Sequence, residues 1–432
     1  MPDTAAPPAE CLTSRSKQGP FSLPFRRPLP SSETDKLLRA DLLCECAGCR
    51  LFDLTGVVMS ALAYGENSQC AQPVLQLADL QCNSGDFFKS CRLSPDGQTV
   101  LSTTETSCSV VLSSVPGEHL QETLYYTGQR SIETTKAVPP NKQIVVGESI
   151  YDAGWHPASQ HFFVTSRDHP IHLYSKETGS LQSNYAGYDH VDELDASTCV
   201  TCNLDGTLIY AGAAKGTVRA WDTECPGRPV FESRSSRTKG LVSALAFCPD
   251  YSGAYAVGTY SNEVFVHVEG DAPAAEPALQ LRGLDFAVTH LRWAPDGAKL
   301  WVGGRNHDAI VCWDMRHTRS EVGRIQRKLA THQRFTFDLD PWGDVLLTGS
   351  QDGQLLAYCT KTFDLLSSVA VPEGNAVNGV SMHAFCALAA VATGQRHFST
   401  GKDEDEAKAE RQSSVSLWRL PFRQMVAPAA AD

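Results

Sequence analysis

A turn motif that recurs along the chain at nearly constant spacing constrains the fold more than any other feature. Its fullest copies are Ser94-Pro95-Asp96-Gly97 and Ala294-Pro295-Asp296-Gly297, and each follows a run in which apolar and polar residues alternate. The proline, or the residue in its place, occupies positions 95, 157, 204, 249, 295, 341 and 384. Units of several strands that repeat every 40 to 45 residues or so are typical of a β-propeller. Seven copies therefore predict an all-β, seven-bladed WD-repeat β-propeller.

Each repeat contains the residues that a propeller blade needs. Pro-Asp-Gly supplies the fixed φ and the positive φ of a tight hairpin turn, and a third strand ends in Trp-Asp at two places. We expect six residues to brace turns or pack blades, namely Asp96, Asp192, Trp221, Asp222, Trp313 and Asp314. An outer strand is expected after each third strand, at 181–185, 229–232, 279–282, 324–329 and 365–371.

The boundaries of the propeller follow from composition. Residues 1–50 are rich in proline, serine and alanine, and predict a disordered or partly helical leader. The propeller is expected over 51–420. Because the last unit has no outer strand of its own, we expect a strand at about 73–80 to close it. The acidic run at 402–410 predicts a disordered insert over 399–412, and 421–432 is expected as a flexible tail.

Composition narrows the class of protein. No run of about 18 apolar residues occurs, so we expect no membrane span. The first ten residues lack the features of a signal peptide, and the 15 scattered cysteines then predict reduced thiols in the cytosol or the nucleus. The net charge of −12 argues against a protein that coats nucleic acid non-specifically, but it leaves room for a local basic surface.

The sequence contains no motif that predicts catalysis. We find no G-x-S-x-G, no P-loop and no H-E-x-x-H, so we expect neither an enzyme nor a cofactor. Cys44, Cys46 and Cys49 lie close together, but a structural zinc site has four ligands. Cys11 or Cys70 would have to supply the fourth; the simpler interpretation is three reduced thiols and no metal.

Basic and aromatic residues recur in turns that emerge on one face of the predicted ring. Turns between second and third strands, and connections between blades, carry the candidate residues Arg167, His169, Tyr188, His190, Arg305, His307, Arg334 and Arg396. Guanidinium groups and aromatic rings suit an unpaired RNA loop, through phosphate contacts and base stacking. We expect these residues to converge near the mouth of the ring and to bind RNA. Pairing with acidic neighbours inside the blades is the competing interpretation.

Several longer stretches resemble the telomerase Cajal body protein family of WD-repeat propellers. They include Phe87-Phe88-Lys89, Asp192-Glu193-Leu194, Gln333-Arg334-Phe335 and Phe337-Asp338-Leu339-Asp340-Pro341, and the similarity covers about residues 75–420. The resemblance implies an RNA-binding scaffold whose partners are H/ACA-type small Cajal body RNA, telomerase RNA where it carries the recognised element, and core proteins that include dyskerin. It also implies a nuclear location in Cajal bodies. The leader, the acidic insert and the cysteine cluster depart from the family pattern.

Two other functions remain open. A WD-repeat adaptor or substrate receptor would bind a peptide on the same face, and the acidic run at 402–410 would then dock a basic partner. A hydrolase would need acids or histidines clustered at the mouth of the ring, which the arginine-rich turns argue against.

Overall fold

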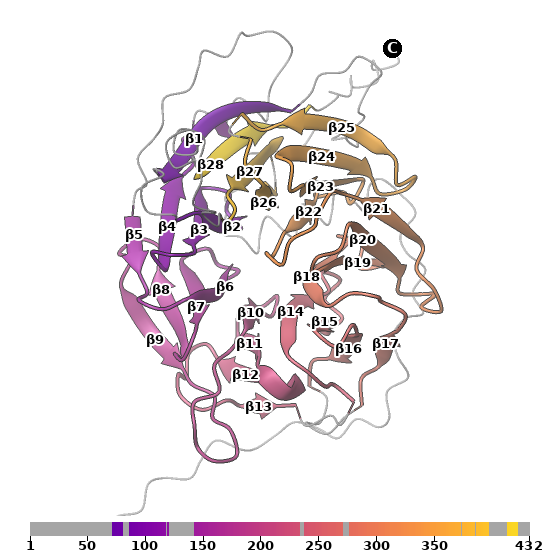
Figure 1. The fold of residues 1–432 in the computed structure, drawn as a ribbon. Coiled ribbons are helices and arrows are strands. Elements are labelled where there is room, and N and C mark those ends of the chain that lie inside the picture. Colours follow the sequence, from indigo (N-terminus) through magenta and orange to yellow (C-terminus); the bar gives the residue numbers. More distant parts are fainter. Residues whose placement is uncertain are drawn as a thin grey trace, which may run out of the picture.

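The computed structural model describes residues 71–80, 86–117, 119–120, 142–233, 237–270, 276–372, 374–384, 386–396 and 413–421. In these ranges the strands form seven four-stranded sheets, arranged as blades around one axis (Figure 1). The predicted all-β, seven-bladed propeller is confirmed. The expected leader, the cysteines at 44, 46 and 49, the insert at 399–412 and the tail beyond residue 421 lie outside the described residues.

Each blade runs from an innermost strand beside the axis to an outermost strand at the rim, and blades are numbered here from the one that begins with β2 (Figure 1). The innermost strands are β2 (Phe88–Leu93), β6 (Ile150–Trp155), β10 (Cys199–Cys202), β14 (Val242–Phe247), β18 (Val288–Trp293), β22 (Phe337–Leu339) and β26 (Val377–Met382). The second strands are β3 (Thr99–Thr104), β7 (His161–Ser166), β11 (Leu208–Gly212), β15 (Ala254–Thr259), β19 (Lys299–Gly304), β23 (Val345–Gly349) and β27 (Leu388–Thr393). The third strands are β4 (Ser109–Ser114), β8 (Ile171–Ser175), β12 (Val218–Asp222), β16 (Val264–Val268), β20 (Ala309–Asp314), β24 (Gln354–Cys359) and β28 (Ser413–Arg419). The outermost strands are β5 (Lys142–Val145), β9 (Leu181–Tyr185), β13 (Phe231–Glu232), β17 (Leu279–Leu281), β21 (Gly323–Gln326), β25 (Leu365–Ala370) and, in the seventh blade, β1 (Gln72–Leu80).

The seventh blade is completed by a strand from the other end of the chain. β1, which contains the strand expected at 73–80, pairs antiparallel with β28 from Gln72 opposite Arg419 to Leu80 opposite Ser413. Figure 1 shows the two strands side by side, one indigo and one yellow. Because every blade then has four strands, the ring closes without an exposed edge between its first and last blades.

The core lies between neighbouring blades. Val264, Val288, Leu300 and Val311 belong to one buried cluster that joins the fourth and fifth blades. Most side chains of the second and third strands are buried on both faces, because each sheet is covered by a blade on either side. The Trp-Asp positions fit this packing: Trp221 is fully buried and Trp313 almost fully.

Four outer strands differ from the expected ranges: β17 and β25 each end one residue earlier, and β13 and β21 differ more. β13 is reduced to Phe231–Glu232, and β21 ends at Gln326 instead of continuing to residue 329. The reason at β21 is Arg327, whose side chain turns inward, is almost fully buried, and donates from Nη1 to Thr348 Oγ1 at 2.9 Å. Because the Arg327 side chain is held in the sixth blade, the chain at this residue leaves the outer edge of the fifth blade and β21 ends.

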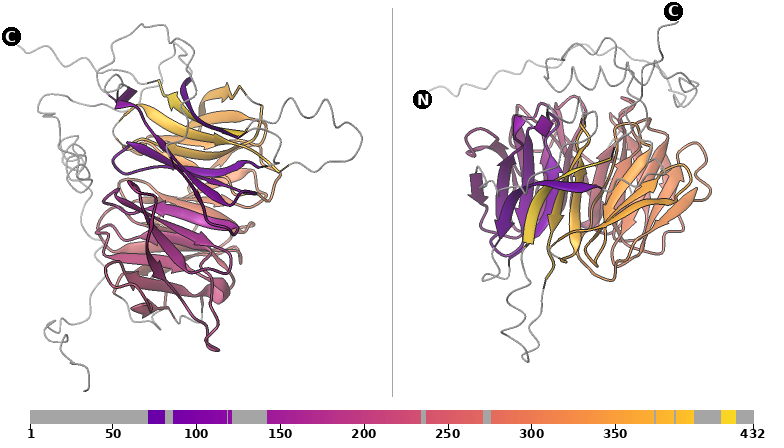
Figure 2. Two further views of the ribbon diagram at one scale, coloured as in Figure 1. Left: turned by 90° about the vertical axis from the view of Figure 1, so that its left-hand side faces the viewer. Right: turned by 90° about the horizontal axis from the view of Figure 1, so that it is seen from above.

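The ring has two different faces, which the side views separate (Figure 2). The hairpin face is formed by the turns between first and second strands and between third and fourth strands. On it, Asp96 accepts hydrogen bonds from Ser94 Oγ and from Gln98 N, and its Oδ2 lies 2.7 Å from Lys176 Nζ. The turn face is formed by the turns between second and third strands and by the connections between blades.

Candidate nucleic-acid interface

The turn face carries exposed arginines, but they lie on separate blades. Arg167 follows β7, Arg305 follows β19, and Arg396 follows β27. All three side chains are exposed. The Nε atom of Arg167 lies 3.4 Å from Oδ2 of Asp168, and the guanidinium of Arg396 pairs with the carboxylate of Glu105 in the first blade. These arginines are spread over the second, fifth and seventh blades, and two of them have acidic partners. Their convergence near the mouth of the ring stays a prediction.

Arg305 and Tyr260 stack on the turn face where the fourth and fifth blades meet. The Arg305 Cζ atom lies 5.4 Å from the centre of the Tyr260 ring, and both residues are exposed. A guanidinium group over an aromatic ring is a favourable cation–π pair that leaves donors free at its edge. Such a pair offers an unpaired base a surface to stack on and offers a phosphate a charged donor.

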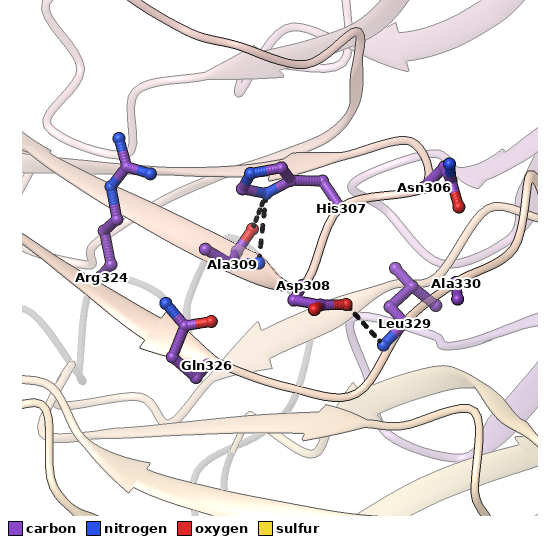
Figure 3. A pocket seen from close by; sticks show the side chains of 8 residues that line it. All are labelled: Asn306, His307, Asp308, Ala309, Arg324, Gln326, Leu329 and Ala330. Carbon is purple, nitrogen blue, oxygen red and sulfur yellow. Dashed lines mark hydrogen bonds between the residues drawn. The ribbon is translucent and has the colours of Figure 1, made fainter.

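His307 lies beside this pair in a shallow hollow of about 460 Å³ on the fifth blade (Figure 3). The His307 ring packs against Phe286 with centroids 4.3 Å apart, and its Nδ1 accepts a hydrogen bond from Ala309 N at 3.1 Å. Figure 3 also labels Asn306 and Gln326 in the lining. Their side-chain amides have no hydrogen-bond partner within the described part of the chain, so their donors and acceptors are available to a polar ligand.

Tyr188 and His190 lie on a small hairpin that projects between the second and third blades. Tyr188 bridges to Leu194, and the Asp189 carboxylate accepts from Val191 N at 2.9 Å and from Glu193 N at 3.1 Å. The carboxylate that braces this turn is thus that of Asp189, and not that of Asp192 as the sequence suggested. Asp192 contributes its backbone instead, in the left-handed region at φ 60°.

The buried guanidinium of Arg219 holds the base of this hairpin. It donates to Asp195 at 2.9 Å, to Glu232 at 3.1 Å and to the carbonyl oxygen of Tyr188 at 3.1 Å. The tip is left exposed: His190 is 79% exposed, and Tyr188, Val191 and Leu194 are exposed as well. The hairpin, residues 188–194, therefore combines apolar side chains with the acidic residues Asp189, Asp192 and Glu193.

His169 stays in its own turn. Its Nδ1 atom lies 2.8 Å from the carbonyl oxygen of Arg167, and its ring is near that of His172, with centroids 5.9 Å apart. Burial lowers the pKa of His172, and the nearby His169 adds to this effect. The exposed Arg167 guanidinium is the part of this turn that can reach a ligand.

Arg334 occupies the middle of the ring instead of the open turn face. It comes from the connection between the fifth and sixth blades, yet its Nη1 lies 3.1 Å from Asp152 Oδ1 of the second blade. The same oxygen is 2.8 Å from Arg92 Nη2 of the first blade. Arg292 Nε lies 2.8 Å from Asp338 Oδ1. We call these residues, Arg92, Asp152, Arg292, Arg334 and Asp338, the axial cluster.

The sequence-based set of candidates omitted Tyr260, Arg92 and Arg292. Tyr260 opens the turn that is equivalent to the one with Arg305, so the same comparison of turns would have found it. Arg92 and Arg292 stand on innermost strands, β2 and β18, where a charged residue is unexpected unless it faces the axis. That position was the available signal for the axial cluster.

Neither a metal cluster nor a membrane helix is found in the described ranges. No group of three or more histidine, cysteine, aspartate or glutamate side chains there is placed to hold a metal ion. Within the same residues, no helix has the length and apolar character needed to cross a membrane.

Comparison with known proteins gives three findings. Residues 187–222 match the family model described as WD domain, G-beta repeat. Telomerase Cajal body protein 1 of Bos taurus is 31% identical over 78% of this chain and 63% of its own length, and that of Homo sapiens is 32% identical over 72% and 58%. The chain thus spans less than two thirds of these relatives. Guanine nucleotide-binding protein negative regulator 1 of Schizosaccharomyces pombe is 31% identical over 84% of this chain and 91% of its own length.

Proposed function

Because the chain belongs to the WD-repeat family that includes telomerase Cajal body protein 1 and the Schizosaccharomyces pombe regulator, we propose that it is an RNA-binding scaffold subunit of H/ACA-type ribonucleoproteins. In this role it recognises a short RNA loop and performs no catalysis. Its partners are small Cajal body RNA, telomerase RNA where that RNA carries the element, and the dyskerin-containing core. Its place is the nucleus, in Cajal bodies or an equivalent compartment.

The observation that carries this proposal is the stacked pair of Arg305 and Tyr260. It is exposed, it combines an aromatic face with a cation, and the hollow beside it offers the free amides of Asn306 and Gln326. Unpaired RNA bases are bound in this way, by stacking and by hydrogen bonds to their edges. Arg167 and Arg396 place further guanidinium groups on the same face, each beside a carboxylate with which an RNA phosphate would compete.

Copurification tests the proposal. RNA that is recovered with the full chain is expected to be enriched in H/ACA-type guide RNA. Changing Arg167, Arg305 and Arg396 together to glutamate is expected to abolish RNA retention, because it replaces three cations on the turn face with anions.

The matched control changes Arg228, Arg316 and Arg319 to glutamate. These arginines are exposed on the hairpin face, and the change in net charge is the same. RNA retention should survive in the control, and thermal unfolding should show that both triple variants are folded. RNA retention that survives in the turn-face variant, or is lost equally in both, would contradict the assignment.

A second candidate function is a protein adaptor, and the hairpin at 188–194 favours it. Its exposed apolar residues lie among Asp189, Asp192 and Glu193, which repel phosphates and attract a basic protein segment. The relative from Schizosaccharomyces pombe, whose name describes a negative regulator of a guanine nucleotide-binding protein, matches over nearly its whole length. A flat RNA profile together with a stoichiometric protein partner that is lost on Val191→Asp would favour the adaptor.

A further inference from the structure

The axial cluster contains more hydrogen-bond donors than its two carboxylates can accept. Asp152 Oδ1 is shared by Arg92 and Arg334, and its Oδ2 accepts from Val200 N at 3.2 Å. Asp338 accepts from Arg292 and from the backbone N–H of Leu339 and Met382, each of these two at 2.9 Å. Every carboxylate oxygen is thus already engaged, while three guanidinium groups each carry five N–H donors.

Some of the remaining donors have no acceptor at all. Arg334 Nε and the Nε2 atom of its neighbour Gln333 are buried, and neither has a hydrogen-bond partner within the described residues. A buried donor without an acceptor costs about 1 to 3 kcal/mol. The connection that carries Arg334 into the ring is therefore short of acceptor atoms.

The cluster is also crowded with like charge. Burial lowers the pKa of Arg92, and the charges of Arg334 and Arg292 act in the same direction, although Asp152 opposes them. His290 adds no further positive charge, because burial and these guanidinium groups push its pKa well below the usual value of 6.5. Three cations around two anions leave a positive centre inside a chain whose net charge is −12.

Solvent reaches these side chains. Arg292 is 51% exposed, Arg92 30% and Arg334 26%. They come from β2, from β18 and from the connection between the fifth and sixth blades, and Arg92 and Arg334 meet at the same carboxylate oxygen of Asp152. The charges of Arg334 and Arg292 both act on Arg92, so the three cations lie close enough to attract the same anion.

We propose that the axial cluster binds a phosphate group. A phosphate supplies the acceptor oxygens that the cluster lacks, offsets its excess positive charge, and matches the planar fork of arginine, which can donate two parallel hydrogen bonds to one oxyanion. This site is separate from the turn face and does not rest on the proposed function. The phosphate belongs either to a small free anion, such as a nucleoside diphosphate, or to an RNA strand whose end enters the ring.

Binding of inorganic pyrophosphate to the full chain tests the proposal. At low ionic strength, isothermal titration is expected to show one site per chain, and pyrophosphate is expected to raise the unfolding temperature. Arg292→Gln should weaken pyrophosphate binding by about tenfold or more, since it removes the most accessible of the three cations. Asp338 keeps its two backbone donors in this variant, which protects the fold. Arg292→Lys keeps the positive charge but not the planar fork of arginine. Its affinity for pyrophosphate should lie between that of the unaltered chain and that of Arg292→Gln.

Arg319→Gln is the matched control. It makes the same change of charge at an exposed position on the hairpin face and should leave pyrophosphate binding unchanged. No binding to the unaltered chain at millimolar pyrophosphate overturns the proposal, and so does an equal loss in both variants. Displacement of pyrophosphate by a short oligouridylate identifies an RNA phosphate as the natural ligand; displacement by a nucleoside diphosphate alone identifies a small anion.

Discussion

The hairpin face and the turn face are built from the same seven blades, but the turns between first and second strands differ from several connections between blades. On the hairpin face, three glycines of these turns lie against side chains of the preceding blade: Gly97 against His383, Gly206 against His156, and Gly343 against Pro295. The turn face is mixed: Gly216 and Gly240 are crowded as well, whereas Gly147 and Gly283, in connections between blades, have positive φ angles and nothing within 4 Å of where a Cβ would be.

This difference separates stability from recognition. The interlocked turns of the hairpin face fix each blade on the next, so their residues are constrained by packing. The turns and connections of the turn face hold exposed residues such as Tyr188, Tyr260 and Arg305, which contribute little to the core and are free to contact a partner.

Replacing one glycine on each face by alanine should show this difference most strongly. Gly97→Ala places a Cβ against the His383 ring, which is buried and accepts a hydrogen bond from Cys386 N at 2.9 Å, so it cannot swing away. We expect a loss of more than about 3 kcal/mol in the free energy of unfolding. Gly283→Ala, at φ 94°, adds backbone strain alone and should cost about 1 kcal/mol. Denaturant titration measures both, and equal losses would remove the distinction.

Removing one aspartate at the axis and one on the turn face extends the comparison. Asp152→Ala leaves Arg92 and Arg334 without their shared carboxylate and should cost about 3 kcal/mol. Asp168→Asn breaks only the exposed pair with Arg167, because asparagine also tolerates the left-handed backbone at φ 57°, and should change stability by less than about 0.5 kcal/mol. The measurement is again the denaturant midpoint. A small effect at Asp152 would mean that water replaces its carboxylate.

Changing Asp340, on the hairpin face, to asparagine is expected to stabilise the chain in a pH-dependent way. Burial raises the pKa of this carboxyl to about 7, above its usual value of 3.8, so the folded chain binds the extra proton between these limits. Stability from this group is therefore present at low pH and is lost as pH rises through about 7. Asp340→Asn, which retains the oxygen that accepts from Val345 N, should stabilise the chain by about 2 kcal/mol above pH 7. This advantage should fade toward pH 4.

Asp96→Asn, in the equivalent turn of the first blade, is the control for Asp340. There Lys176 forms an ion pair at 2.7 Å, and the pKa is lowered overall, because hydrogen bonds from Lys176 and Ser94 outweigh the largest single effect, burial. The variant should lose stability above pH 4 instead of gaining it. Parallel pH profiles for the two variants would contradict the roles given to these carboxylates.

The smallest effect on stability is expected when an exposed tyrosine on either face is replaced by alanine. Tyr260→Ala and Tyr251→Ala should each change the free energy of unfolding by less than about 0.5 kcal/mol. RNA retention should separate them: it should fall about tenfold for Tyr260, which loses its stack with Arg305, and remain unchanged for Tyr251 on the hairpin face. Equal retention would place the RNA away from the fourth and fifth blades.

The sequence predicted the hairpin face better than the turn face, and the reason is physical. A tight turn needs a positive φ angle, so glycine recurs at 97, 206, 297 and 343, where φ lies between 69° and 75°. Such a local requirement leaves a periodic trace in the sequence. The number of blades follows from that trace.

The partners of the candidate arginines leave no such trace. Arg334 meets Asp152, and Arg396 meets Glu105, across blades that are far apart in the chain. Whether an arginine in a turn is free or paired depends on these long-range contacts, which only the closed ring creates. Arg305 is different. Its partner, Tyr260, occupies the equivalent turn of the neighbouring blade, so a comparison of equivalent turns in the sequence brings the two residues together.

The pairing of β1 with β28 sets an order of events during synthesis. β28 leaves the ribosome after all other strands of the ring, so β1 has to wait without its partner while six blades are made. During this time β1 exposes apolar side chains such as Val74 and Leu77, which are buried in the finished ring. Contacts of such high sequence separation form late and slowly. The chain should therefore depend on chaperones until its last strand has been translated.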